Sequence, residues 1–202
     1  RYSYDALDRL IMVHKGQERT RYQYDAFNRR MYSWSEIKDG DGWKEIACLR
    51  FLYHGDNDIG TIDAKTGEVL SLRILGEGKG AEIGAAVALE LKGKVYVPCY
   101  DHRGSVAMLI DTATAKVAET YRYSAFGEEQ IFDSGLNLVS KSSVGNPWRY
   151  SSKRVDDETG YVFFGRRYYM PEAGRWLTAD PLGFQAGPNL YAYVSNNPLN
   201  RL

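Results

Sequence analysis

The sequence predicts an all-β fold in which antiparallel β-hairpins form one curved sheet. Residues 1–10 and 21–30 agree at six of ten positions, so one short segment occurs twice. The chain also contains 16 Tyr and 4 Trp, and aromatic side chains suit the pleated, half-buried surface of a sheet. Clusters of Gly, Asp and Asn separate the apolar and alternating runs, as turns separate strands.

The repeat has a period of 20 residues, and each period predicts one β-hairpin. Tyr2 and Tyr4 alternate as in a strand, and residues 5–8 supply turn formers. Two further strands are predicted over residues 10–14 and 18–24. A hairpin cannot bury its apolar face alone, but stacked hairpins can, which predicts one continuous curved sheet.

Further strands are expected as far as residue 123. They are predicted over 44–53, 95–100, 105–110 and 117–123. Residues 81–91 fit either a strand or a short helix, and residues 140–146 fit a surface loop. The spacing Gly76-x-Gly78-x-x-Ala81 matches a loose dinucleotide-binding fingerprint. No acidic residue follows it at the right place in a βαβ unit, so a flexible loop is expected there.

The C-terminal stretch, residues 148–202, is dense in aromatic, Gly, Pro and Asn residues. It predicts an irregular aromatic plug with one short helix. Turn residues at 156–160 and 171–174 separate β-prone runs. Asn189 is expected to cap a helix over Leu190–Ser195. The Asn-Asn-Pro sequence that follows ends this helix, because proline disfavours the α conformation in the residue before it.

The same stretch carries an ordered set of residues that points to a family. The set comprises Asp157 with Thr159-Gly160, Gly165-Arg166-Arg167-Tyr168-Tyr169, Gly174-Arg175-Trp176, Asp180-Pro181 with Gly183, Asn189-Leu190-Tyr191 with Tyr193, and Asn196-Asn197-Pro198. It resembles the core domain of the Rhs/YD-repeat proteins. These include bacterial polymorphic toxins, insecticidal toxin-complex C components and, more distantly, teneurins. The Tyr-Asp pairs of the N-terminal repeat match the family's other signature, and residues 121–127 resemble a degenerate Tyr-Asp unit.

The resemblance implies an architecture and a function. In this family the hairpins spiral into a hollow β shell, and the core domain seals one end. Residues 1–146 are therefore expected to be shell, and residues 147–202 a core domain truncated before its second Asp-Pro motif. The expected function is encapsulation and delivery of a C-terminal toxin by a secreted or cell-surface-associated effector. The expected partners are the toxin domain of the same parent chain, a secretion apparatus and immunity proteins.

The resemblance also implies self-cleavage, because the core of toxin-bearing members is similar to an aspartyl protease. Asp180 matches the first catalytic aspartate and Arg167 matches the assisting arginine, with Arg166 and Arg175 as alternatives. From residue chemistry alone, an aspartate before a proline predicts only the start of a turn. The second Asp-Pro motif would follow the last residue of this sequence, so the 202-residue chain is expected to be catalytically silent.

A function of another class stands beside this one. The alternative is a teneurin-like adhesion or carbohydrate-binding β module whose plug is purely structural. An exposed aromatic groove would favour this alternative, whereas aromatic side chains packed inward favour the shell.

Composition argues against several other partners. Basic and acidic residues number 26 each, so no net field attracts nucleic acid. The sequence has no run of about eighteen apolar residues, so no membrane insertion by this segment is expected. The chain begins at Arg1 without a charged-then-apolar leader, which indicates a segment of a longer polypeptide.

No cofactor and no metal site are expected. The three histidines lie far apart in the sequence and form no ligand motif. Residues 156–158 fit a solvated hairpin turn better than a cation site. Cys48 and Cys99 make no disulfide framework, and two buried free thiols are favoured over one disulfide.

Overall fold

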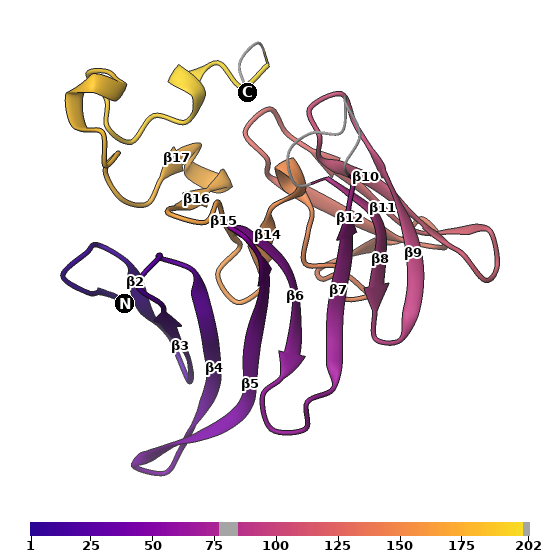
Figure 1. Ribbon diagram of the computed structural model, residues 1–202, viewed down its shortest axis with the longest axis horizontal. Coiled ribbons are helices and arrows are strands. Elements are labelled where there is room, and N and C mark those ends of the chain that lie inside the picture. The colour runs from indigo at the N-terminus through magenta and orange to yellow at the C-terminus, as the bar shows by residue number, and fades with distance from the viewer. Residues whose placement is uncertain (77–84, 200–202) are drawn as a thin grey trace. The chain divides into compact units, whose positions relative to one another are not determined.

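The computed structural model describes residues 1–76 and 85–199 (Figure 1). The chain divides into two compact units, residues 1–72 and residues 73–202, and each is described by itself. Apart from four short 3₁₀ helices, the regular structure of the described residues is β, which confirms the predicted fold class. The predicted division after residue 146 is a separate matter and stays a prediction.

Thirteen strands form one open sheet in which each strand lies beside its neighbours in the chain, from β1 to β13. They are β1 Tyr2–Tyr4, β2 Leu10–Lys15, β3 Glu18–Tyr24, β4 Arg30–Asp39, β5 Gly42–His54, β6 Asn57–Asp63, β7 Val69–Leu75, β8 Ala86–Leu91, β9 Lys94–Tyr100, β10 Val106–Asp111, β11 Lys116–Tyr123, β12 Glu129–Asp133 and β13 Leu138–Val139. Consecutive strands pair antiparallel, as in β4 with β5 and β9 with β10. The run of hairpins predicted from the sequence is confirmed.

A second sheet of four strands lies in the C-terminal stretch, in the order β14-β15-β16-β17. Its strands are β14 Arg154–Asp156, β15 Tyr161–Phe163, β16 Tyr168–Met170 and β17 Arg175–Trp176. Three-residue and four-residue 3₁₀ helices flank and interrupt it: η1 Tyr150–Ser152, η2 Pro171–Ala173, η3 Gly183–Ala186 and η4 Val194–Asn196. The plug is thus less irregular than predicted, because the turns at 156–160 and 171–174 each join two paired strands.

Both copies of the repeat form the same five-residue turn. In the first copy the N–H of Asp5 donates to the carbonyl of Arg9 at 3.0 Å, and the N–H of Asp8 donates to the carbonyl of Asp5 at 3.1 Å. The Asp5 carboxylate caps the turn, because its Oδ1 accepts the N–H groups of Leu7 and Arg9 at 2.9 and 3.0 Å. Asp8 has a φ of 57°, a left-handed conformation that Asp, Asn and Gly tolerate best.

This turn is more widespread than the sequence repeat. The same two backbone hydrogen bonds form in turns that begin at Asp25, Asp101, Ser124 and Asp133. The fourth residue of each has a positive φ, and these residues are Asn28, Gly104, Gly127 and Leu136. The degenerate unit predicted at residues 121–127 therefore has the turn of a full repeat.

An arginine links successive turns within each unit. The guanidinium of Arg9 donates from Nη1 to the carbonyl of Asp25, in the next turn, at 3.1 Å. The corresponding Arg29 reaches the carbonyl of Gly55 at 3.2 Å, and Arg103 reaches that of Ala125 at 3.0 Å. These bonds add to the backbone pairing that joins neighbouring hairpins in the sheet.

A second type of turn closes hairpins at three other places. In segments 63–67, 111–115 and 156–160 the N–H of the fifth residue donates to the carbonyl of the first at 2.9, 2.9 and 2.7 Å. Each segment begins with Asp, and the fourth residue of each is Thr. Five-residue turns of at least two types therefore join strands in the described part of the chain.

Two aromatic-rich clusters of buried side chains lie among the described residues of unit 2. One contains Leu89, Leu109, Tyr121 and Trp148 among its buried residues. The other contains Tyr150, Val155, Val162, Tyr169 and Tyr193, and it joins the four-stranded sheet to the segment that follows it. Most of the plug aromatics therefore pack inward, as the shell interpretation expects, whereas Phe184 and Tyr191 are exposed.

The predicted helix over Leu190–Ser195 is wrong. Asn189 does accept the N–H of Tyr191 at 3.0 Å, but this cap starts a turn and not a helix. Ala192 then bridges to Arg175, and only η4 follows. A helix of six residues is marginal by itself, and here pairing to β17 satisfies the backbone instead.

The remaining predictions have mixed outcomes. Residues 86–91 are strand β8, while the rest of the ambiguous 81–91 segment and the predicted loop over 76–80 lie largely outside the described residues. Residues 140–146 form a loop, but Asn146 is completely buried, so this loop is only partly a surface feature. Cys48 and Cys99 are free thiols, and Cys99 is half-buried.

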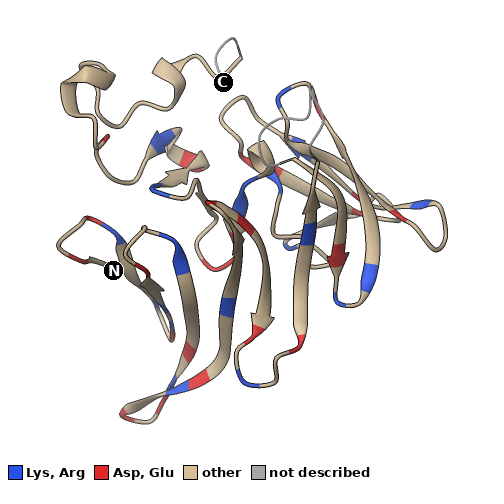
Figure 2. Ribbon diagram, in the orientation of Figure 1, with Lys and Arg blue, Asp and Glu red and all other residues tan. Residues whose placement is uncertain are grey.

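Charges of both signs are interspersed along the strands (Figure 2). None of the helices in the described residues has the length and apolar character that crossing a bilayer requires.

Candidate active site

Arg167 stands at the end of the turn that joins β15 to β16. The N–H of Phe164 donates to the carbonyl of Arg167 at 3.0 Å, which closes the turn. Gly165 takes a φ of 88° within it, a conformation that a side chain would strain. Arg167 therefore precedes strand β16 directly, and the sheet fixes its backbone.

Asp180 begins a turn, as residue chemistry alone predicted. Its Oδ1 accepts the N–H of Leu182 at 3.0 Å, and its carbonyl accepts the N–H of Gly183 at 2.9 Å. The N–H of Asp180 donates to the carbonyl of Leu190 at 2.8 Å. These three bonds hold the Asp-Pro step and leave the second carboxylate oxygen, Oδ2, for another partner.

That partner is Arg167, whose Nη2 lies 2.8 Å from Oδ2 of Asp180. Each of the two side chains is 17% exposed, so the pair is largely but not completely shielded from solvent. The guanidinium carbon of Arg167 lies 4.1 Å from the ring centroid of Trp176. Its Nη1 is buried and has no hydrogen-bond partner within residues 1–76 and 85–199.

The two alternative arginines lie elsewhere. Arg166 is exposed. Arg175 lies over the ring of Tyr191, at 4.4 Å from its centroid, and its Nε donates to the carbonyl of Trp176 at 3.3 Å. Of the three candidate arginines, Arg167 is the one that the structure pairs with Asp180.

Sequence reasoning missed an ionic cluster around a buried arginine at the start of the C-terminal stretch. Arg149 is 1% exposed, and its Nε and Nη2 lie 2.9 Å from Glu129 and 2.6 Å from Asp157. Burial alone would lower the pKa of Arg149, but the two carboxylates outweigh it and raise that pKa. Its Nη1 also donates to the carbonyl of Asn146 at 2.6 Å. Asp157 thus pairs with Arg149 and is also an exposed residue of the hairpin turn at 156–160, as the sequence predicted, although Asp156 is buried.

Trp176 is the other residue that sequence reasoning did not single out. The Gly-Arg-Trp motif was noted as a whole, and nothing local distinguished the tryptophan as a neighbour of Arg167. The charge-to-ring contact joins residues nine positions apart across strand β16 and the turn at 171–174, so only the tertiary structure reveals it.

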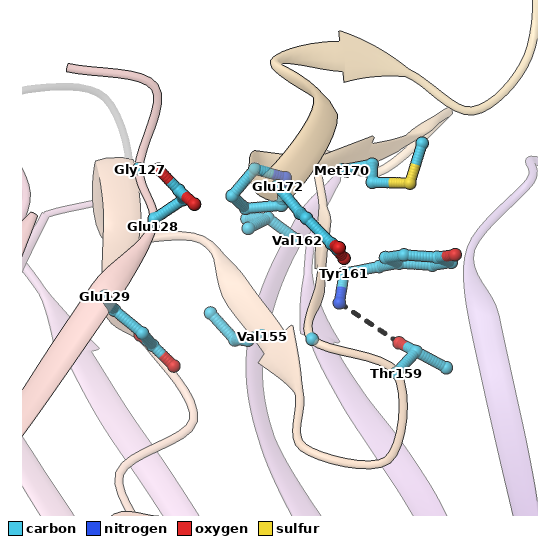
Figure 3. Close-up of a pocket in the computed structure, with 11 residues that line it drawn as sticks. Gly127, Glu128, Glu129, Val155, Thr159, Tyr161, Val162, Met170 and Glu172 are labelled. Atoms are coloured by element: carbon cyan, nitrogen blue, oxygen red, sulfur yellow. Dashed lines mark hydrogen bonds between the residues drawn. The ribbon is translucent and has the colours of Figure 1, made fainter. Parts of the chain in front are cut away.

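A cavity of about 180 Å³ lies near the start of β12 and is separate from this pair (Figure 3). Apolar side chains such as Val155, Val162 and Met170 line one part, and Glu128 and Glu172 another. The N–H of Tyr161 donates to the Thr159 hydroxyl at 3.1 Å within its wall. Neither Arg167 nor Asp180 lines it.

The described residues contain no group of three or more His, Cys, Asp or Glu side chains that could bind a metal ion. The candidate site in unit 2 is therefore the pair of Asp180 and Arg167. One carboxylate oxygen of Asp180 contacts Nη2 of Arg167, and the buried Nη1 of the same arginine has no partner among the described residues.

Individual proteins of known sequence or structure identify the family, although no family model matches the chain. Double-stranded DNA deaminase toxin A of Burkholderia cenocepacia is 25% identical over 223 residues, which covers 97% of this chain and 15% of that protein. Toxin subunit YenC1 of Yersinia entomophaga is 30% identical over 185 residues, covering 88% of this chain and 18% of that protein.

The crystal structure of TcdB2-TccC3, an Rhs-repeat toxin complex, matches all of this chain with a TM-score of 0.69 at 22% identity. The chain belongs to the Rhs/YD-repeat proteins. It covers 10% of the matched TcdB2-TccC3 chain, and so spans a small part of each of these proteins. The Rhs/YD-repeat shell fold expected from the sequence is confirmed, and the relatives of the chain are Rhs and toxin-complex proteins.

Proposed function

We propose that this chain is the terminal part of an Rhs/YD-repeat shell that encloses and delivers a C-terminal toxin. In this proposal residues 1–146 belong to the shell, and residues 147–202 are the core domain that seals it. The parent is an exported effector, and its partners are its own toxin domain, a secretion apparatus and immunity proteins. The toxin names of the relatives and the inward packing of the plug aromatics support this function.

We further propose that the intact parent cleaves itself with an aspartyl-type site that contains Asp180 and Arg167. The ion pair between these residues carries the proposal, because it places a half-shielded carboxylate beside a buried donor that has no partner among the described residues. A second aspartate, from an Asp-Pro motif beyond residue 202, would complete the dyad. The 202-residue chain is then silent by itself.

The chemistry needs two carboxylates with different tasks. One takes a proton from a water molecule as the water oxygen attacks the scissile carbonyl carbon. The other, protonated, gives its proton to the leaving peptide nitrogen as the C–N bond breaks. Arg167 orients Asp180 through Nη2, and its Nη1 is available to the second carboxylate or to the scissile carbonyl oxygen.

The test uses the chain extended by an Asp-Pro-x-Gly-Leu motif and a C-terminal tag. Intact mass is followed over time for this chain and for its Asp180→Asn and Arg167→Ala forms. Two matched variants, Asp8→Asn and Arg122→Ala, remove a carboxylate and a guanidinium at exposed positions. We expect one cut just after the added motif in the unchanged chain and in both controls. Asp180→Asn should abolish the cut, and Arg167→Ala should slow it at least about a hundredfold.

An extended chain that folds and stays uncut would remove the catalytic roles of Asp180 and Arg167. The plug would then be purely structural, and the adhesion or carbohydrate-binding alternative would be the next to examine. The burial of Tyr150, Tyr169 and Tyr193 favours the shell over that alternative, which would have to use the exposed Phe184 and Tyr191.

A further inference from the structure

Trp176, a neighbour of the proposed catalytic pair, is held by contacts on several sides. Its ring meets those of Phe164, Tyr193 and Tyr169 edge to face, at centroid distances of 5.2, 5.5 and 5.7 Å. Its backbone pairs with Tyr169, and its N–H donates to the carbonyl of Tyr191 at 2.9 Å. Three rings and two backbone contacts therefore fix the plane of the indole.

Arg167 lies on this fixed ring. The guanidinium carbon is 4.1 Å from the ring centroid, well within the range of a cation–π interaction, and tryptophan is the strongest ring for such contacts. The guanidinium is planar, so a contact that fixes the group also fixes the directions of both terminal nitrogens. The contact with the Trp176 ring therefore keeps Nη2 next to Asp180 and keeps Nη1 at a fixed position beside the ion pair.

The buried Nη1 of Arg167 indicates that a further hydrogen-bond acceptor binds beside Asp180. A buried donor without an acceptor costs free energy, and native proteins leave few of them without a reason. Within residues 1–76 and 85–199 no acceptor reaches Nη1. The position fits an oxygen acceptor, either a carboxylate or a peptide carbonyl, that arrives from a segment outside the described residues.

We propose that Trp176 is a positioning residue for the reaction, which holds the Arg167 guanidinium so that one nitrogen binds Asp180 while the other waits for the incoming oxygen. This inference rests on the proposed self-cleavage. The role is electrostatic as well as steric, because the negative face of the indole carries the positive charge of Arg167. Preorganised donors of this kind cost no rearrangement when the reaction occurs.

The chain supplies a matched control for this role. Arg175 and Tyr191 form a second charge-to-ring pair in the same unit, with 4.4 Å between the guanidinium carbon and the ring centroid. Arg175 donates to a backbone carbonyl, and the structure gives it no ion pair to Asp180. Weakening this second pair should leave the proposed site unaffected.

The test replaces Trp176 with tryptophans that carry one, two and four fluorine atoms, in the chain extended by the second Asp-Pro motif. Fluorine weakens the electrostatic attraction of the ring with little change in its shape. We expect the rate of self-cleavage to fall stepwise with each fluorination, by about tenfold over the series. Fluorotyrosine at position 191 should leave the rate unchanged. A rate that does not vary along the tryptophan series would overturn the positioning role and leave the proposed self-cleavage standing.

A second measurement separates the two proposals, because it needs no cleavage. Nitrogen-15 NMR of the 202-residue chain reports how freely the Arg167 guanidinium turns. We expect separate Nη signals in the unchanged chain, which broaden and merge progressively along the fluorinated series. If the extended chain is never cut but these signals change as expected, the self-cleavage fails and the hold of Trp176 on Arg167 stands. If the Nη signals are already averaged in the unchanged chain, the guanidinium turns freely, and the claim that Trp176 fixes Arg167 is wrong.

Discussion

Gly127 lies against the aromatic ring of Tyr150, so closely that a Cβ at residue 127 would come within 2.8 Å of three ring carbons. Gly127 occupies the positive-φ position of a Tyr-Asp-type turn, with a φ of 90°. Tyr150 belongs to the buried cluster that contains Tyr169 and Tyr193. Direct contact between a turn of the large sheet and the aromatic plug therefore requires glycine at this position.

Replacement of Gly127 by alanine should destabilise the chain strongly. The added methyl group meets the ring of Tyr150 and also strains a backbone with φ near 90°. We expect the free energy of unfolding to fall by about 3 to 4 kcal/mol, measured by urea denaturation. Gly165→Ala is the matched control, because Gly165 has a φ of 88° and nothing within 4 Å of its added Cβ. Gly165→Ala should lower the free energy of unfolding by only about 1 to 2 kcal/mol. Equal losses in the two variants would contradict the packing argument.

Glu119 should be essential for the loop that leads into the plug. Its carboxylate accepts hydrogen bonds from the hydroxyl groups of Tyr121, Ser142 and Ser143 and from the N–H of Ser143. Its side chain is completely buried. Glu119→Gln replaces one accepting oxygen by a donating NH₂ group, so we expect a loss of about 2 to 3 kcal/mol in unfolding free energy.

Glu128→Gln is the control for Glu119→Gln, because Glu128 is exposed and should change stability by less than about 0.5 kcal/mol. Urea denaturation of the two variants under identical conditions makes the comparison. If Glu119→Gln unfolds at the same urea concentration as the unchanged chain, the buried network has no stabilising role.

The stability of the repeat turn should depend more on the accepting oxygen of Asp25 than on its negative charge. Oδ1 accepts the N–H groups of Phe27 and Arg29 at 2.8 and 2.9 Å, while Oδ2 lies 2.7 Å from Nε of Arg29. Asn keeps the first oxygen and loses the ion pair, whereas Ala loses both. We expect Asp25→Asn to cost about 0.5 kcal/mol and Asp25→Ala about 2 kcal/mol. Equal costs would show that the cap contributes little.

Glu36 should make the stability of the chain fall in acid. The guanidinium groups of Arg19 and Arg21 lie 2.6 and 2.9 Å from its carboxylate, and the hydrogen bond from Arg19 is the main reason that the pKa of Glu36 is lowered. A group whose pKa is lower in the folded state stabilises above its unfolded pKa, near 4.5, and loses this contribution as the pH falls below that value.

Replacement of Glu36 by Gln therefore should destabilise the chain by about 1 to 2 kcal/mol at pH 7. The difference between the two chains should shrink as the pH falls through the range below 4.5, where the carboxylate of the unchanged chain becomes protonated. Thermal denaturation across this pH range measures the difference. A difference that stays constant or grows in acid would contradict the ion-pair account.

Local patterns in the sequence predicted the features that depend on local chemistry. The Tyr-Asp turns at Asp5 and Asp25 could be anticipated because an aspartate caps its own turn within four residues. The pairing of Arg167 with Asp180 was expected only through the resemblance to a family. Spacing in the sequence gives no reason for these two side chains to meet.

Features that depend on distant partners were not predicted. Glu119 bonds to residues 23 and 24 positions away, although its place in an alternating strand on the same face as Tyr121 was an available signal of burial. The helix over Leu190–Ser195 failed for the same kind of reason, because backbone pairing of Ala192 with Arg175 outweighed a weak local preference.

The most direct test of the proposed function is native mass spectrometry of a parent chain that continues past residue 202 into its own downstream domain. Under native conditions the particle should have the summed mass of shell and enclosed domain. After denaturation the same sample should give two chains, divided just beyond residue 202, and Asp180→Asn should give one undivided chain in a particle of the same mass. A native particle that lacks the downstream domain, or an Asp180→Asn parent that is still cut at that place, would contradict the account.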